Sequence, residues 1–131
     1  MFNSKKQPPI KSLIAQGTRI VGNIEFIEGL RIDGQVSGNL TAVEGSRSIL
    51  VVSETAEVVG EIRADHVIAN GAIVGPVYAS ELLELQPRAR IQGDVYYKSL
   101  EMHQGAMITG QLRPVTGDQE KPTLTLAASN A

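Results

Sequence analysis

Residues 31–40, RIDGQVSGNL, place an apolar or small residue at every second position. Ile32 and Val36 share one parity with Gly34 and Gly38, and polar residues occupy the other. Successive side chains of a strand point to opposite faces, so this alternation predicts a strand with one buried and one solvated side. Glycine packs nothing inside a strand and weakens it. Two glycines on the buried side therefore indicate a structure other than an ordinary sheet strand.

The pattern apolar-x-Gly-x-apolar, seen at residues 36–40, occurs six times between residues 20 and 112. Its glycines are Gly22, Gly38, Gly60, Gly75, Gly93 and Gly110, separated by 16, 22, 15, 18 and 17 residues. The longest interval contains VEGSRS (43–48), which is typical of a surface loop inserted between repeats. An apolar-x-apolar pair precedes most of the units. This regularity indicates an internal repeat of about 18 residues.

A repeat of this length with short alternating strands predicts an all-β fold, a three-sided parallel β-helix with about six rungs. Helical repeats need longer periods, and propeller blades need about 40 residues. Neighbouring rungs stack at about 4.8 Å, so equivalent aliphatic residues form continuous buried columns. The six glycines are interpreted as corners, where the narrow interior leaves no room for a side chain and the backbone needs dihedrals that glycine tolerates.

The composition limits the possible functions. The chain has 131 residues, which favours one domain, with 42% hydrophobic but only 4% aromatic residues. A net charge of −2 with mixed signs argues against a nucleic-acid surface, which needs a basic stripe. The absence of cysteine excludes a disulfide framework and a thiolate metal site. No run approaches the roughly 20 apolar residues of a membrane span, and no signal peptide is evident, so a cytoplasmic location is expected.

The two ends differ from the repeats in composition. Residues 1–11 and 114–131 are polar, contain proline and show no lasting periodicity. Both are therefore predicted to be disordered tails, and the β-helix is predicted to span residues 12–113.

Five stretches resemble the bactofilin family in their order and spacing, and together they cover nearly all of residues 12–113. They are SLIAQGTRIVGNI (12–24), EGLRIDGQVSGNL (28–40), VVGEIRADHVIANGAIVGPV (58–77), LELQPRARIQGDV (83–95) and LEMHQGAMITGQL (100–112). One departure is Pro76, which follows Gly75 where other repeats carry a polar residue. Proline donates no backbone hydrogen bond, so this corner is expected to be locally unpaired.

The resemblance implies both a fold and a function. Bactofilins are bacterial cytoskeletal proteins whose core is a right-handed β-helix flanked by disordered tails. They polymerise end to end into non-polar filaments without nucleotide. Many lie on the inner face of the cytoplasmic membrane and scaffold cell-wall enzymes that control shape. By this resemblance the chain is expected to be a cytoplasmic, membrane-peripheral scaffold. Its expected partners are other copies of itself, the lipid surface and cell-wall or morphogenesis proteins, but neither nucleic acid nor nucleotide.

Polymerisation is predicted to use the two end rungs, because an uncapped solenoid leaves a backbone edge and an apolar column unpaired. The first rung offers Leu13, Ile14, Ile20, Ile24 and Phe26, and the last offers Met102, Met107, Ile108 and Leu112. Contact between like ends gives a non-polar filament, and head-to-tail contact gives a polar one. The residues do not choose between these, whereas the resemblance favours the non-polar form. The alternative is that the tails fold over the ends.

The N-terminal segment is a candidate membrane tether, formed by Met1, Phe2, Lys5 and Lys6. Each basic residue near anionic lipid contributes about 1 kcal/mol, which is weak alone but is multiplied by avidity in a filament. Composition alone favours a solubilising tail, and the resemblance to bactofilins favours the tether.

Two outward columns are candidate contact surfaces. Tyr78 and Tyr96 each follow a corner glycine by three residues, and Val21, Val59 and Val74 share another repeat position. Both sets are predicted to stack on the outside of the coil. They serve either as lateral contact surfaces or, as we favour, as cross-rung packing.

Catalysis is not predicted, and no catalytic, cofactor-binding or metal-binding residue is assigned. His66 and His103 occupy different positions of the repeat, which argues against a paired metal site. No nucleophile elbow or phosphate loop occurs, so no cofactor is expected. The carboxylates on the polar parity are interpreted as solubilising charges: Asp33, Glu61, Asp94 and Glu101.

Two other functions remain open. A left-handed β-helix acyltransferase also has rungs near 18 residues, and ARIQGDV (89–95) suits its hexapeptide repeat. Such an enzyme needs a strict six-residue register, which is interrupted by Gly34, Gly38, Gly71 and Gly75. The other alternative is a β-helix adaptor that does not polymerise.

Overall fold

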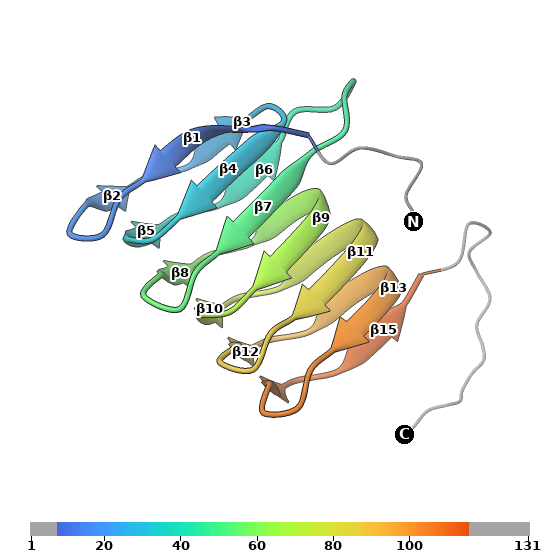
Figure 1. Cartoon of the computed structure of the whole chain (residues 1–131). Coiled ribbons are helices and arrows are strands. Elements are labelled where there is room, and N and C mark those ends of the chain that lie inside the picture. Colours follow the sequence, from blue (N-terminus) through green and yellow to red (C-terminus); the bar gives the residue numbers. More distant parts are fainter. Residues whose placement is uncertain (1–7, 116–131) are drawn as a thin grey trace.

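The computed structural model describes residues 8–115, which form fifteen short β-strands and no helix (Figure 1). The strands pair in parallel and wind into a coil of six three-sided rungs. In Figure 1 the strands in front run to the lower left, the fainter strands behind them return, and the coil advances from its N-terminal to its C-terminal end. This is a right-handed coil. The fold class predicted from the sequence is confirmed.

Each rung contributes one strand to each of three faces. The first face comprises β1 (Ile10–Ile14), β4 (Gly29–Ile32), β7 (Ile49–Val52) and the second halves of β9 (Ile62–Ala69), β11 (Val77–Leu85) and β13 (Val95–Met102). The second face comprises β2 (Arg19–Val21), β5 (Gln35–Ser37), β8 (Glu57–Val59), β10 (Ala72–Val74), β12 (Arg90–Gln92) and β14 (Met107–Thr109). The third face comprises β3 (Ile24–Phe26), β6 (Leu40–Ala42), the first halves of β9, β11 and β13, and β15 (Leu112–Pro114).

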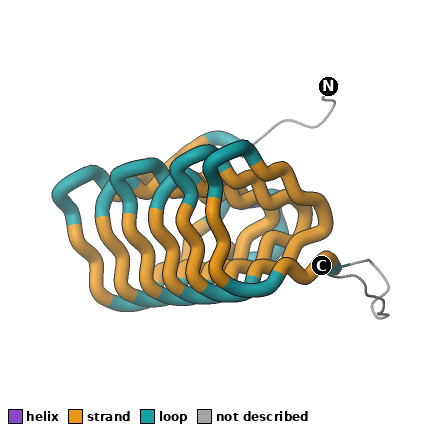
Figure 2. Tube along the Cα trace, turned by 90° about the horizontal axis from the view of Figure 1, so that it is seen from below, coloured by secondary structure: helices purple, strands orange, loops and turns teal. Residues whose placement is uncertain are grey.

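The rungs stack face on face along the coil (Figure 2), and the core inside them consists of aliphatic columns that run from rung to rung. The second face contributes Ile20, Val36, Val58, Ile73, Ile91 and Ile108, and the third face contributes Ile24, Leu40, Ile62, Val77, Val95 and Leu112. In the four inner rungs these side chains are at most 1% exposed, and each contributes about 1.5–3 kcal/mol by its burial. The side chains in the two outer rungs are only partly covered.

The glycines of the opening stretch allow neighbouring rungs to approach closely. Gly38 lies between β5 and β6 with φ +154°, and a Cβ there would lie 2.0 Å from the carbonyl oxygen of Gly22 in the rung before. Gly60 repeats this contact one rung later, against the oxygen of Gly38. Gly34 lies at the preceding corner, where a Cβ would lie 2.4 Å from the oxygen of Thr18. The obstacle is therefore the backbone of the adjacent rung, rather than the interior of the coil as the sequence suggested.

The corner at Pro76 is paired, contrary to the expectation from the sequence. Its carbonyl accepts a hydrogen bond from the Ile62 N–H at 3.0 Å, and the following Val77 N–H donates to the rung beyond. In other rungs the residue at this position donates its N–H to a side chain, as Glu61 does to Asn39 Oδ1 at 3.0 Å. Proline therefore removes one side-chain cap and no ladder hydrogen bond.

The described strands extend slightly beyond the boundaries predicted for the solenoid. The first begins at Ile10 and the last ends at Pro114, whereas residues 12–113 were predicted. Within residues 8–115 no helix has the length and hydropathy needed to cross a membrane.

Alanine substitution at two corner glycines separates backbone strain from rung clash. Gly22→Ala introduces only the strain of φ +132°, because nothing lies within 4 Å of the added Cβ. We expect it to lower the free energy of unfolding by about 1–2 kcal/mol. Gly60→Ala adds the collision with the Gly38 carbonyl, and we expect a loss of about 3–5 kcal/mol. Urea denaturation followed by circular dichroism measures both, and equal losses would contradict the role given to the carbonyl.

Candidate polymerisation surfaces

The N-terminal end of the stack presents three strands that each lack a partner on one side among the described residues. β1, β2 and β3 pair only with β4, β5 and β6 of the second rung. Ile20 and Ile24 are half-buried at this end and head the aliphatic columns of the second and third faces. An open backbone edge beside exposed apolar side chains is a template for pairing with another chain.

The first rung contains the five residues predicted there, but they are not equally exposed. Ile14 and Phe26 are 8% and 7% exposed, so they belong mainly to the core of the chain itself. Leu13 is 57% exposed and lies opposite Arg31, which places it on the outer side of the first face. The register of β1 shifts between Ile10 and Ser12, and Ser12 lies opposite the buried Leu30. The apolar surface of this end is therefore centred on the second and third faces.

The C-terminal end is open in the same way and more apolar. β14, β15 and the second half of β13 have no partner beyond them within residues 8–115. Met102, Ile108 and Leu112 continue the buried columns of Leu85, Ile91 and Val95, and Met102 and Leu112 are 48% and 46% exposed. These three predicted residues lie together on one end surface.

Two details of this end differ from the sequence prediction. Met107 lies opposite Arg90 in an outward column, so it is on the side of the stack rather than on its end. Leu100 lies opposite the buried Leu83 and belongs to the end surface, although it was not assigned there. Leu100 could have been assigned to this end from the sequence, because Leu100 and Met102 form the apolar-x-apolar pair that precedes the last repeat unit.

The outer side of the third face carries a ladder of stacked side chains. Tyr78 and Tyr96 stack with ring centroids 4.5 Å apart and 10° between their planes, which confirms the predicted stack. The guanidinium carbon of Arg63 lies 3.8 Å from the Tyr78 centroid, and that of Arg113 lies 5.8 Å from the Tyr96 centroid. Burial and the neighbouring Tyr78 raise the pKa of Tyr96 above its ordinary value. Both arginines could also have been placed in this column from the sequence, because each follows a corner glycine by three residues, as the two tyrosines do.

The valine column on the second face is less regular. Val59 and Val74 are adjacent, but Ser37 separates Val59 from Val21. Val21 is 78% exposed, compared with 46% and 38% for the other two. The column therefore offers one apolar pair and one isolated side chain.

The loop at 43–48 lies beside a groove of about 730 Å³, at the corner between the third and first faces. Asp65 fastens the base of this loop. Its carboxylate accepts hydrogen bonds from the Ser48 N–H at 3.0 Å and from the Ser80 hydroxyl, and its own N–H donates to Ser48 Oγ at 2.9 Å. The predicted insertion is thus anchored to two later rungs.

Three of the four carboxylates interpreted as solubilising charges form ion pairs or hydrogen bonds with other groups of the chain. Asp33 pairs with Arg31 at 2.9 Å, Glu61 pairs with Arg63, and Asp94 accepts the Gln111 N–H at 3.0 Å. Hydrogen bonding from Ser53 is the main cause that lowers the pKa of Asp33, and the Gln111 N–H is the main cause that lowers the pKa of Asp94.

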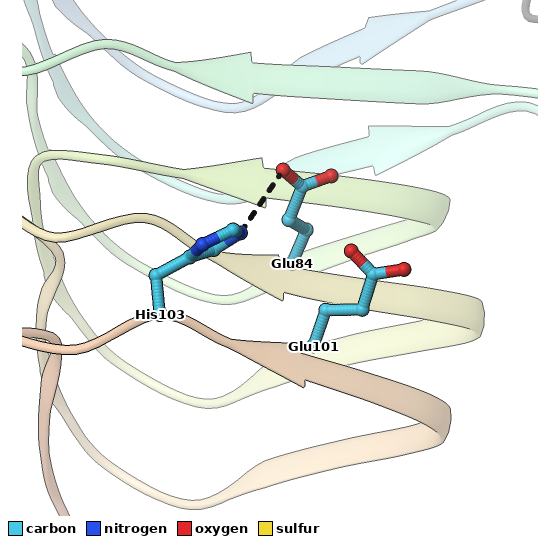
Figure 3. A group of neighbouring side chains, drawn as sticks. All are labelled: Glu84, Glu101 and His103. Carbon is cyan, nitrogen blue, oxygen red and sulfur yellow. Dashed lines mark ion pairs between the residues drawn. The ribbon is translucent and has the colours of Figure 1, made fainter.

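Both histidines lie near Glu84, although they occupy different repeat positions. His103 Nε2 lies 3.7 Å from Glu84 Oε2, the ion pair drawn in Figure 3, and His66 Nε2 lies 4.0 Å from Glu84 Oε1. His66 is 8% exposed, and this burial lowers its pKa, opposed by the charges of Glu84 and Glu101. Different repeat positions therefore do not prevent both imidazoles from approaching the same carboxylate group.

The comparisons with known proteins identify this architecture. The family model for bactofilins, described as polymer-forming cytoskeletal, matches residues 12–113. The chain belongs to the bactofilin family. Bactofilin BacP of Myxococcus xanthus (strain DK1622) is 28% identical to it over 101 residues, which are 77% of this chain and 40% of BacP. The match thus spans well under half of that bactofilin. No solved structure matches the chain.

Membership of the bactofilin family bears on the alternatives left open by the sequence. A polymer-forming cytoskeletal family is consistent with a structural rather than an enzymatic role. The left-handed acyltransferase is contradicted by the right-handed coil and by the family assignment. The residues at the two ends are therefore the candidate functional site of this bactofilin.

The buried His66 predicts a dependence of stability on pH. Its pKa is lowered in the folded chain, so below about pH 6.5 the unfolded chain binds more protons and the free energy of unfolding falls. We expect the urea midpoint to decrease between pH 7 and pH 5, and the decrease to be smaller in His66→Gln. His103→Gln, which replaces a half-exposed imidazole, is the matched control. A pH profile unchanged by His66→Gln would contradict this assignment.

Proposed function

We propose that this chain is a cytoskeletal scaffold that assembles end to end into filaments without nucleotide. The observation that carries the proposal is the pair of uncapped ends, each with three open strand edges beside partly exposed aliphatic columns. Stacking one end on another would pair these edges and bury the columns. The family to which the chain belongs is polymer-forming, which supports the same function.

We propose that contact joins like ends, so that the filament is non-polar. Such a contact is isologous, since the same surface meets itself across a two-fold axis. Six rungs at about 4.8 Å give a subunit roughly 30 Å long. A non-polar filament repeats every two subunits, at roughly 60 Å, whereas a head-to-tail filament repeats at roughly 30 Å. The axial repeat in electron micrographs distinguishes the two.

The filament is proposed to lie on the inner face of the cytoplasmic membrane and to recruit cell-wall or other morphogenesis proteins. The proposed tether of Met1, Phe2, Lys5 and Lys6 lies outside the described residues. Pro9, among the first described residues, lies against Gly29 at the corner between the third and first faces. A row of weak tethers along a filament binds a surface through avidity.

A charge at the C-terminal end tests assembly. Ile108→Asp places a carboxylate in the proposed contact, and an unpaired charge there costs at least about 2 kcal/mol. We expect the critical concentration to rise at least about 30-fold. Met107→Asp is the matched control, because it adds the same charge one residue away on the outward side of β14. Sedimentation and negative-stain microscopy without nucleotide measure the effect.

The same experiment distinguishes the adaptor from the polymer. Wild-type protein that stays monomeric at high concentration would favour an adaptor that does not polymerise. Filaments of Ile108→Asp that form at the wild-type concentration would contradict end-rung stacking. Circular dichroism of the variant checks that its solenoid remains folded.

Removal of the N-terminal segment tests the tether. We expect a variant lacking residues 1–6 to lose most of its pelleting with vesicles that contain anionic lipid, because it loses both the apolar tip and two cations. A Lys5→Ala/Lys6→Ala double variant is expected to retain part of the binding, and its residual binding is expected to be independent of salt. Unchanged pelleting of the shortened chain, with filaments intact, would contradict the tether.

A further inference from the structure

Three side chains with metal-binding groups lie together on the outer side of the first face (Figure 3). Glu84 in β11 lies directly opposite Glu101 in β13, and His103 follows β13. One ligand atom from each residue lies within 4.8 Å of the other two. The group therefore joins the fifth rung to the sixth, with Glu84 and Glu101 in an outward column of the first face.

The negative charges of Glu84 and Glu101 would be stabilised by a cation between them. Glu84 and Glu101 are like charges in register on adjacent strands, an arrangement that is destabilising by itself. Among the ion pairs recorded in residues 8–115, no lysine or arginine accompanies either carboxylate. The ion pairs of Glu84 are with the two histidines.

The geometry suits a small divalent ion. Zn²⁺ binds imidazole nitrogen and carboxylate oxygen at about 2.0–2.2 Å, which puts ligand atoms of a tetrahedral site about 3.4 Å apart. The His103 Nε2 to Glu84 Oε2 distance of 3.7 Å is close to this, and a ligand atom of Glu101 lies within 4.8 Å of both other ligands. Gln86 Nε2 donates a hydrogen bond to Glu84 Oε2 at 3.2 Å, which helps to orient that carboxylate.

The backbone holds the histidine in place. The His103 N–H donates to the Leu85 carbonyl at 2.8 Å, and the His103 carbonyl accepts from the Ala106 N–H at 3.2 Å. His103 is thereby fixed to the rung that carries Glu84, while its ring stays half exposed and accessible to solvent. Three ligands, two on strands and one held by backbone hydrogen bonds directly after β13, leave a fourth position for water, as in open zinc sites.

We propose that Glu84, Glu101 and His103 bind one divalent transition-metal ion, for which Zn²⁺ is the probe. A nitrogen ligand together with two carboxylates selects such an ion over Mg²⁺ or Ca²⁺, which prefer oxygen ligands alone. The bound ion replaces the repulsion between the two carboxylates by attraction and clips the last rung to the one before it. The proposal does not require filament assembly, because all three ligands come from one chain.

The test is a titration of the full chain, freed of any purification tag, with Zn²⁺ in competition with a chromophoric chelator. We expect one ion per chain, with binding unaffected by millimolar Mg²⁺. His103→Ala and Glu84→Gln are each expected to weaken binding at least tenfold. Glu57→Gln, which removes a carboxylate on the second face, is the matched control and is expected to bind as the wild type does.

A second measurement keeps the test independent of folding. Zn²⁺ is expected to raise the thermal unfolding midpoint of the wild type and of Glu57→Gln but not that of His103→Ala. Circular dichroism without metal is expected to be the same for all four proteins. The proposal is overturned if no saturable binding occurs, if His103→Ala binds Zn²⁺ as tightly as the wild type, or if Mg²⁺ displaces the ion.

Discussion

The fold depends on the approach of each corner to the rung beneath it. At Gly38 and Gly60 the space that a Cβ would fill is occupied by the carbonyl oxygen of the preceding corner, 2.0 Å away. A side chain there would push two rungs apart at one corner and disturb the hydrogen bonds along all three faces. The repeated glycine therefore sets the spacing that lets the strands pair and the aliphatic columns close.

Once this spacing is fixed, equivalent residues meet in every rung, and each column acquires one chemical character. The inward columns are aliphatic and dry. An outward column on the third face becomes two stacked aromatic rings between two guanidinium groups, from Arg63 to Arg113. The columns stop only where the rungs stop. The candidate functional surfaces are thus the ends of the buried columns. The burial of aliphatic side chains that stabilises one chain is also proposed to join two chains.

The sequence predicted what the repeat itself encodes and missed what interrupts it. The glycine period was sufficient for the coil, its six rungs and the Tyr78–Tyr96 stack. Leu13 faces outward because adjacent residues of a strand point to opposite faces, and Ile14 takes the inward position opposite Ile32. The approach of His66 and His103 to Glu84 was not predicted. The three residues lie on three successive rungs and do not share a repeat position, so the repeat pattern does not align them. The anchoring of the 43–48 loop by Asp65 left no periodic signal either.

The stacking of nearly identical rungs makes the rung a unit of length. Each rung contacts only its neighbours, so the ends do not depend on how many rungs separate them. Insertion or loss of one repeat of about 18 residues would lengthen or shorten the subunit by about 4.8 Å and leave both end surfaces intact. Copy number can therefore change the distance between successive attachment points along a filament in fixed steps, with the joining surfaces unaltered. In such a protein, the length of the subunit and the chemistry of its end surfaces can evolve separately.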